Sequence, residues 1–254
     1  MARGELLLDH YLAMSPGDDD TIEGIDTIEP SFGLPAKWIT EAVKEEAEIM
    51  GYTVVDPPSV VSTHMTEIIR NHAHELLGRQ ETKQLIDHIR ETSPILVDEL
   101  TPTPMTIGEI QKVLGNLLRE HVSIRNLPII FETLADYSKM TSDVDILTED
   151  TRQALAKQIT SQDAGSSNTL RVLTVSGKVE KMVADSIQQT EHGNYLSIDP
   201  TDSQAILESM AREVERASLM EQSPIILCSP AVRMYLRQMT ERYFPQIPIL
   251  SYNE

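Results

Sequence analysis

Cysteine and aromatic residues are scarce in this sequence. The single cysteine, Cys228, excludes a disulfide within the chain, and it lies in the apolar run Ile225-Ile-Leu-Cys228 without a companion motif that would mark it as a nucleophile. Aromatic residues make up 4% of the chain, whereas hydrophobic residues make up 40%. The core must therefore consist mainly of aliphatic side chains, which is typical of helix-rich and α/β proteins.

Long apolar runs are also missing. No stretch reaches the ~18 consecutive apolar residues that a membrane-spanning helix needs, and the apolar run near the start is too short for a signal peptide. We therefore expect the chain as given to be soluble. Its 254 residues are enough for about two domains or several smaller ones. It opens and closes on strand-like runs, which suggests a fragment of a longer protein.

Positive charge is in short supply. The chain has 21 Lys and Arg against 40 Asp and Glu, a formal net charge of −19. Because non-specific affinity for nucleic acid comes from cations that neutralise phosphates, this balance argues against nucleic-acid binding, and against anionic membrane surfaces for the same reason. Basic partner surfaces remain possible.

The first part of the chain predicts a small α/β unit over residues 4–56. We expect a strand over Glu5–Met14, a helix over Thr40–Gly51 and a strand over Tyr52–Val55. Asp56-Pro-Pro-Ser59 then breaks the strand and starts a helix. Six of its residues recur at helical spacing: Val61, Met65, Ile68, Ile69, His72 and Leu76.

The rest of the chain divides into a helical part and an α/β part. Up to about Ser161 we expect helices over Gln80–Arg90, Ile107–Arg119 (Thr106 and Glu109 forming a capping box), Leu127–Tyr137 (capped by Asn126) and from Thr148 onward. Ser161–Asn168 has the composition of a linker. Beyond it we expect strands over Leu170–Val175, Ile225–Cys228 and Ile247–Leu250, and helices over Val179–Gln189, Ser203–Glu221 and Ala231–Tyr243. Strands separated by helices indicate a parallel or mixed sheet covered by helices.

The helices Ile107–Arg119 and Leu127–Tyr137 have the form of a helix-turn-helix. A recognition helix normally presents Arg, Lys, Asn or Gln to base edges, but the second helix offers Glu132, Thr133 and Asp136. A packed helical module is therefore the better interpretation, and a DNA-binding regulator the more remote one.

Two groups of residues suggest metal sites only at first sight. His72 and His74 are two residues apart on a helix and point to different faces, so they cannot chelate one ion together with the nearby His64. The acidic run Asp18–Asp26 resembles a calcium loop, but it lacks the glycine that the EF-hand pattern requires at its sixth position. A solvated acidic loop explains it better.

A small-molecule or nucleotide enzyme is the alternative function that the C-terminal α/β part leaves open. Ser229-Pro230 follows the strand Ile225–Cys228 and starts a helix, so its backbone N–H groups could face an anion. No glycine-rich phosphate loop and no Gly-x-Ser-x-Gly motif accompanies it. A simple helix start is the favoured interpretation of Ser229.

The segment Glu29-Pro-Ser-Phe-Gly-Leu-Pro35 places a large apolar residue, Phe32, in a context typical of rigid, exposed loops. An aromatic side chain held in such a loop loses little entropy on binding, so it can anchor a partner. Packing of Phe32 into the core of the small unit is the equally weighted alternative.

Five tracts, in order and spacing, resemble the cytoplasmic region of the FHIPEP family, the export-gate proteins of the bacterial flagellar type III secretion apparatus and its virulence homologues. The tracts are Phe32-Gly-Leu-Pro-Ala-Lys-Trp38, Gly51-Tyr-Thr-Val-Val-Asp56, Ser62-Thr-His64, Gly78-Arg-Gln-Glu81, and Val122-Ser-Ile-Arg125 with Ile130-Phe-Glu-Thr-Leu134. The residues of these tracts are more similar to flagellar than to virulence members of the family.

The resemblance implies a cytoplasmic region of four subdomains, of which the first is incomplete here. Residues 1–8 and 57–76 would belong to the first subdomain, 9–56 to a ferredoxin-like second one built on a split βαβ unit, 77–156 to a helical third one and 157–254 to an α/β fourth one. The full-length protein would be integral to the bacterial inner membrane, with this soluble fragment on its cytoplasmic face.

The resemblance also implies a role without catalysis or cofactor. Family members form a nine-membered ring and receive late export chaperones with bound filament, cap and hook-junction subunits, and they contact the export ATPase complex. The chaperone site is an apolar dimple. Carried over position by position, its residues are Met14, Pro16, Glu29, Phe32, Leu34, Val55, Val60 and Thr63. Two of them depart from the family pattern: Met14 replaces a branched aliphatic residue, and Glu29 replaces an aspartate.

Overall fold

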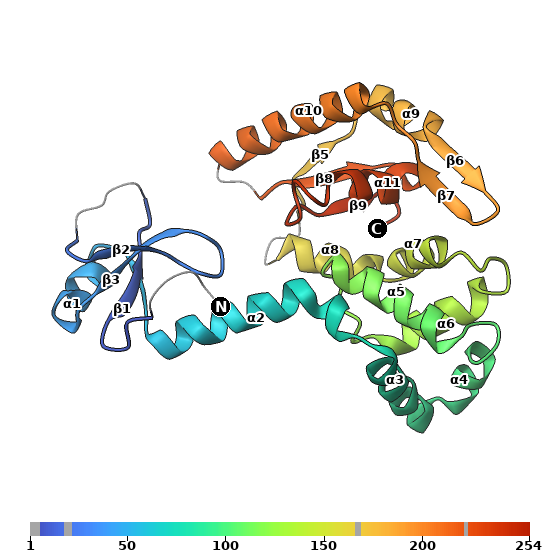
Figure 1. Cartoon of the computed structure of the whole chain (residues 1–254), viewed down its shortest axis with the longest axis horizontal. Coiled ribbons are helices and arrows are strands. Elements are labelled where there is room, and N and C mark those ends of the chain that lie inside the picture. Colours follow the sequence, from blue (N-terminus) through green and yellow to red (C-terminus); the bar gives the residue numbers. More distant parts are fainter. Residues whose placement is uncertain (1–5, 18–21, 166–168, 221–222) are drawn as a thin grey trace. The chain divides into compact units, whose positions relative to one another are not determined.

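The computed structural model describes residues 6–17, 22–165, 169–220 and 223–254 (Figure 1). The chain forms two compact units, Met1–Leu76 and Leu77–Glu254. Among the described residues, no helix is both long and apolar enough to cross a membrane.

The first unit is built on a four-stranded antiparallel sheet in the order β2-β3-β1-β4. Its elements are β1 (Tyr11–Met14), β2 (Ile25–Ile28), β3 (Pro35–Ile39), α1 (Glu41–Ile49), β4 (Thr53–Val55) and α2 (Pro57–Leu76). Because β3 and β4 both run antiparallel to β1, which lies between them, β3, α1 and β4 form a split βαβ unit. This confirms the predicted core motif.

The two faces of this sheet carry separate cores. Along β1, Leu12 packs with Trp38 and Val60 on one face, while Ala13 packs with Ile39 on the other, as the alternation of strand side chains requires. The second face also contacts Ala47 of α1 and Tyr52, which lies between α1 and β4. On the first face, α2 contributes chiefly its first turns, since its buried residues are Pro57 and Val60.

Several predictions for the first unit need correction. The strand expected over Glu5–Met14 begins only at Tyr11, and Glu5 lies outside the described residues. The strands β2 and β3 were not predicted, because β2 is a mostly exposed edge strand and β3 contains Pro35 and Lys37 in place of an apolar run. The helix α2 forms as expected, but the apolar stripe along it is exposed: Val61, Met65, Ile68, Ile69 and Leu76.

The second unit begins with six helices: α3 (Arg79–Thr92), α4 (Pro94–Leu100), α5 (Ile107–Arg119), α6 (Leu127–Tyr137), α7 (Val144–Ala154) and α8 (Ala156–Ala164). The predicted capping box of α5 is present, with the Glu109 N–H donating to Thr106 Oγ1 at 3.2 Å and the Thr106 N–H donating to Glu109 Oε2 at 2.7 Å. In α6, Ile130, Phe131 and Leu134 are fully buried. This helix therefore belongs to the core, which agrees with a packed module.

Three predictions for these helices are wrong in detail. The helix expected from Thr148 starts four residues earlier, because Asp143 caps α7 by accepting bonds from the N–H groups of Asp145 and Ile146. Asn126 makes no side-chain capping bond to α6. The expected linker over 161–168 is helical up to Ala164, and residues 166–168 lie outside the described part of the chain.

The α/β part holds a parallel three-stranded sheet in the order β5-β8-β9 and a separate hairpin. Its elements are β5 (Val172–Thr174), α9 (Gly177–Asp185), β6 (Ile187–Thr190), β7 (Gly193–Leu196), α10 (Pro200–Leu219), β8 (Ile225–Cys228), α11 (Pro230–Thr240) and β9 (Ile249–Ser251). The helix expected over Val179–Gln189 ends at Asp185, and the rest of that range enters the hairpin. Glu221, the expected end of α10, lies outside the described residues.

Both faces of the β5-β8-β9 sheet are buried. Ile225 and Leu250 pack into the core of the helices α3 to α8, whereas Ile226, Cys228 and Ile249 pack into a second core with α9 and α11. Burial on both faces explains why β8 is a continuous apolar run without alternation. The helical and α/β parts of the second unit therefore share a core.

Candidate functional site

The loop between β2 and β3 is closed by its own backbone. The Glu29 N–H donates to the Leu34 carbonyl at 2.8 Å, and the Gly33 N–H donates to the Glu29 carbonyl at 3.0 Å. Gly33 has a φ of +69°, a left-handed conformation that glycine adopts without strain. Six residues thus form a compact loop with Phe32 near its tip.

The Glu29 side chain turns back into this loop. Its Oε1 accepts a bond from the Ser31 N–H at 2.9 Å, and its Oε2 accepts one from the Phe32 N–H at 2.7 Å. Glu29 is only 4% exposed. Sequence reasoning expected a polar neighbour of the binding site, whereas the structure shows a carboxylate whose two oxygens are both engaged by loop backbone.

Phe32 is 61% exposed and Leu34 is 49% exposed. The alternative in which Phe32 fills the core of the small unit is therefore wrong. Singly exposed apolar residues are common on protein surfaces. An aromatic ring beside a second apolar side chain, on a loop held by four hydrogen bonds, is a more specific arrangement that suits a binding anchor.

Three further predicted site residues gather on one face of the β2-β3-β1-β4 sheet. Val60, which is buried, and the half-buried Met14 and Val55 belong to one cluster with Leu12 and Trp38. Thr63 follows Val60 by about one turn of α2 and is exposed.

An open hollow of about 480 Å³ lies at the end of the same sheet. Met14, Pro16 and Leu34 line it, together with Ala13, Lys37 and Tyr52. The ammonium of Lys37 is held here by the Ile22 carbonyl at 3.2 Å and by Asp26 at 3.5 Å. Met14 belongs both to this hollow and to the Val60 cluster, so the two adjoin at the end of β1. The structure thus divides the eight predicted residues among the hollow, the cluster, the loop and Thr63.

The anion site considered at Ser229 is already filled by the chain itself. Glu180 of α9 accepts a bond from the Ser229 N–H at 2.7 Å through its Oε1. A carboxylate at the first turn of α11 satisfies the helix N-terminus in the way that a bound anion would. The feature that supported an enzyme in the α/β part is therefore an internal helix-terminus contact.

Cys228 also lacks the properties of a nucleophile. The residue is fully buried, and its thiol lies 3.6 Å from the Leu250 carbonyl oxygen. Burial raises the pKa of Cys228 to about 12, because the thiolate is disfavoured away from water. The thiol stays protonated at physiological pH, as expected for a structural cysteine.

Metal ligands are not gathered in the part of the chain that the structure describes, where no group of three His, Cys, Asp or Glu side chains could hold an ion. His72 is hydrogen-bonded to Glu75 at 2.8 Å. Of the acidic run that resembles a calcium loop, residues 18–21 lie outside the described residues.

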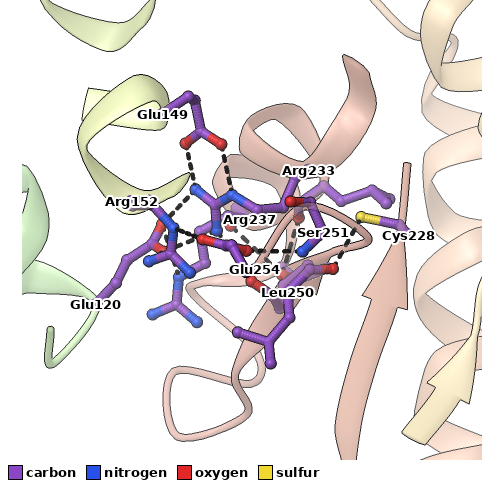
Figure 2. A network of polar contacts seen from close by, with 12 residues as sticks. Glu120, Glu149, Arg152, Cys228, Arg233, Arg237, Leu250, Ser251 and Glu254 are labelled. Atoms are coloured by element: carbon purple, nitrogen blue, oxygen red, sulfur yellow. Dashed lines mark hydrogen bonds and ion pairs between the residues drawn. The ribbon is translucent and has the colours of Figure 1, made fainter. Parts of the chain in front are cut away.

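The second unit contains a buried charge network that joins its two parts (Figure 2). Arg233 of α11 donates to Glu120, at the end of α5, at 2.8 and 3.2 Å, and to Glu149 of α7 at 2.7 and 2.5 Å. Arg152 of α7 bonds to Glu120 at 2.7 Å and to Glu254 at 2.5 Å. No spacing in the sequence predicts this network, because its members are up to 134 residues apart along the printed chain.

The arginines determine the ionisation of Glu120. Burial alone raises the pKa of this carboxyl, but the charges of Arg233 and Arg152 outweigh burial and hold its pKa below the ordinary value. Paired and hydrogen-bonded in this way, the network holds two parts of the fold together. The paired charges lie between packed elements, so we assign them a structural role.

Comparison with known proteins agrees with the resemblance found in the sequence. The flagellar biosynthesis protein FlhA of Bacillus subtilis is 67% identical over 255 residues, covering 100% of this chain and 38% of the relative. FlhA of Borreliella burgdorferi is 38% identical over 251 residues, covering 99% of this chain and 36% of the relative. The chain therefore spans well under half the length of these relatives.

Solved structures share the fold. The CdsV protein of Chlamydia pneumoniae superposes with a TM-score of 0.91 at 28% identity, over 100% of this chain and 74% of that one. The nonameric cytosolic domain of EscV, from a type III secretion system, gives a TM-score of 0.76 at 27% identity, over 98% and 74% of the two chains. The mixed α/β fold class is thereby confirmed.

These relatives are named as a flagellar biosynthesis protein and as the cytosolic domain of a type III secretion protein. The sequence pattern of the FHIPEP family matches residues 1–254, the whole chain. On this match, on the 67% identity to a curated relative and on the shared fold, the chain belongs to the FHIPEP family.

Proposed function

We propose that this chain is a cytoplasmic docking platform of the bacterial flagellar protein export apparatus. It binds late export chaperones with their bound filament, cap or hook-junction subunits and delivers those subunits to the export gate. The observation that carries the proposal is Phe32, 61% exposed at the tip of a loop closed by its own backbone and by Glu29.

The physical argument rests on preorganisation. A phenylalanine has few rotatable bonds, and a loop already fixed in the free protein has little entropy left to lose on binding. Leu34 and the hollow lined by Met14 and Pro16 extend the apolar surface beside the loop. The Val55 and Val60 cluster supports the same sheet, and Thr63 supplies a polar group on α2.

Negative charge on the first unit supports a partner with a basic surface. The helix α1 presents exposed Glu41, Glu45, Glu46 and Glu48, and its Lys44 lies over the ring of Tyr11 at 4.6 Å. The electrostatic field of these carboxylates increases the association rate with a cationic partner and repels nucleic acid.

We propose further that the full-length protein forms a nine-membered ring on the cytoplasmic face of the inner membrane and contacts the export ATPase complex. Support comes from related structures: the SctV cytosolic domain of EPEC and EscV are nonameric, and CdsV was solved in complex with CdsO. The four-subdomain layout, with boundaries at residues 9, 57, 77 and 157, is part of the same proposal.

Replacing Phe32 by alanine tests the docking site. We expect the Phe32→Ala chain to bind a late chaperone–subunit complex at least ~30-fold more weakly, because a hot-spot aromatic contributes ~2 kcal/mol or more. Isothermal titration measures this affinity. Tyr195→Ala, which removes a 53% exposed aromatic side chain from the second unit, is the matched control. Unchanged affinity of a folded Phe32→Ala chain would exclude Phe32 as the anchor.

A further inference from the structure

Glu29 is a buried carboxylate within an exposed loop. It is 4% exposed, whereas Ile28 before it is 66% exposed and Phe32 after it is 61% exposed. Burying a carboxylate is costly unless hydrogen bonds compensate its lost hydration. At this position the compensation comes from the loop itself.

The Glu29 carboxylate accepts one hydrogen bond from Phe32, the proposed anchor, and one from the residue before it, Ser31. One carboxylate oxygen lies 2.9 Å from the Ser31 nitrogen and the other 2.7 Å from the Phe32 nitrogen. Hydrogen bonds to an ionised acceptor are stronger than neutral ones. A bond to the N–H of Phe32 fixes the peptide plane before its Cα, and therefore restricts the direction in which the Phe32 side chain leaves the backbone.

The backbone bonds of the same loop complete this constraint. Glu29 donates to Leu34 and accepts from Gly33 through its main chain, at 2.8 and 3.0 Å, while its side chain accepts bonds from Ser31 and Phe32. A single residue thus contributes to all four hydrogen bonds that shape the loop. No other residue between Glu29 and Leu34 takes part in more than one of these four bonds.

We infer that Glu29 is a positioning residue: its carboxylate fixes the loop so that Phe32 is presented in a binding-ready orientation, and it acts on the partner through Phe32. This inference rests on the proposed docking function. A direct charge contact with the partner is disfavoured, because both carboxylate oxygens are engaged and almost no surface of Glu29 is accessible.

A double-mutant cycle distinguishes positioning from direct contact. Glu29→Gln keeps the shape of the side chain but leaves one acceptor oxygen where two are needed. We expect this variant to bind a late chaperone–subunit complex about tenfold more weakly, the effect of one lost charge-assisted hydrogen bond. In the Phe32→Ala background, Glu29→Gln should cause no further loss, because the residue that it positions is absent.

The outcomes separate the inference from the proposed function. If Glu29→Gln weakens binding equally with and without Phe32, the carboxylate contacts the partner directly and the positioning role is wrong. If Glu29→Gln has no effect while Phe32→Ala does, the docking site stands and the positioning role again fails. If Phe32→Ala has no effect, the proposed anchor itself is wrong.

A measurement on the free chain tests the positioning role without any partner. Amide hydrogen exchange should be faster at Ser31 and Phe32 in Glu29→Gln than in the parent chain, since the two N–H groups lose their acceptor. Unchanged exchange at both amides would overturn the inference. Glu215→Gln, which removes the same charge from an exposed position of α10 in the second unit, is the control, and it should change neither the exchange nor the affinity.

Discussion

At the scale of single residues, the neighbours of a buried carboxylate decide what it does. Glu29 is surrounded by backbone N–H groups of its own loop and determines local conformation. Glu120 faces the guanidinium groups of Arg152 and Arg233 and joins helices that are distant in sequence. The sequence predicted Glu29 only as a residue of the chaperone site and predicted no role for Glu120, whereas in the structure each makes its principal contacts within the protein.

Glu120→Gln should destabilise the second unit by ~3 kcal/mol or more at neutral pH, because it leaves buried arginines without their charge partner. The arginines hold the pKa of Glu120 below its unfolded value of 4.5. Its stabilisation is therefore fully present above pH 4.5 and is lost as the pH falls through the folded-state pKa. Urea unfolding at a series of pH values should show parent and variant converging below pH 4.5.

The control for this experiment is Glu213→Gln. Glu213 pairs with Arg216 at 3.0 Å on the exposed side of α10, where both side chains remain accessible to water. An exposed pair of this kind contributes ~0–1 kcal/mol. Equal destabilisation by the two substitutions, or a difference that does not depend on pH, would contradict the role assigned to Glu120.

At the scale of elements, capping decides where helices begin. The sequence predicts the capping box of α5 correctly, because Thr106 and Glu109 have the required spacing of three residues. For α7 the acidic run Glu149-Asp150 suggests a start near Thr148, yet Asp143 accepts bonds from two N–H groups and starts the helix at Val144. Several residues in this stretch could cap a helix, and packing selects among them.

Asp143→Ala should lower the free energy of unfolding of the second unit by ~1 kcal/mol, the usual contribution of a helix N-cap. Chemical denaturation followed by circular dichroism measures the change. Asn126→Ala is the matched comparison, since Asn126 precedes α6 but makes no side-chain capping bond. A larger loss of unfolding free energy from Asn126→Ala than from Asp143→Ala would contradict the capping role of Asp143.

At the scale of the whole molecule, the sheet β5-β8-β9 lies between the helical and the α/β cores of the second unit. One face of the sheet completes the core of the helices through Ile225 and Leu250, and the other face completes the core around α9 and α11. The charge network in Figure 2 adds ion pairs that join α11 to α7 and to Glu120 at the end of α5, at the same junction. Because both faces of the sheet are buried, the sheet connects the helical part of the second unit to its α/β part.

Leu250→Ala should destabilise the second unit by ~2–5 kcal/mol, as expected for a large-to-small change in a packed core. Because Leu250 belongs to the helical core, native-state hydrogen exchange should accelerate in α5 and α6 as well as in β8 and β9. Leu219→Ala, at an 82% exposed position, is the control and should have little effect. Faster exchange confined to the α/β part would show that the two parts open independently.

Local physical chemistry in the sequence was sufficient for the acidic character, most helices and the rigid loop around Phe32, whereas the family came from the resemblance of five sequence tracts. Capping residues, helical periodicity and glycine–proline turns act over a few residues, so they can be read without a fold. The hairpin β6–β7 was missed because Ile187-Gln-Gln-Thr190 continues the helical pattern of α9 and carries no strong strand signal. The edge strand β2 was missed for the related reason that its residues are mostly exposed.

Only the tertiary structure decided which side chains are accessible and which charges meet. It exposed Phe32, buried Glu29 beneath the same loop, filled the helix start at Ser229 with Glu180, and brought Glu120 to Arg233 across 113 residues. Burial and ion pairing depend on contacts between elements far apart in the chain, and such contacts produce no local residue pattern that a single sequence would show. The sequence determined most of the helices and, through its resemblance, the family, while packing between the elements determined which surface is accessible to a partner.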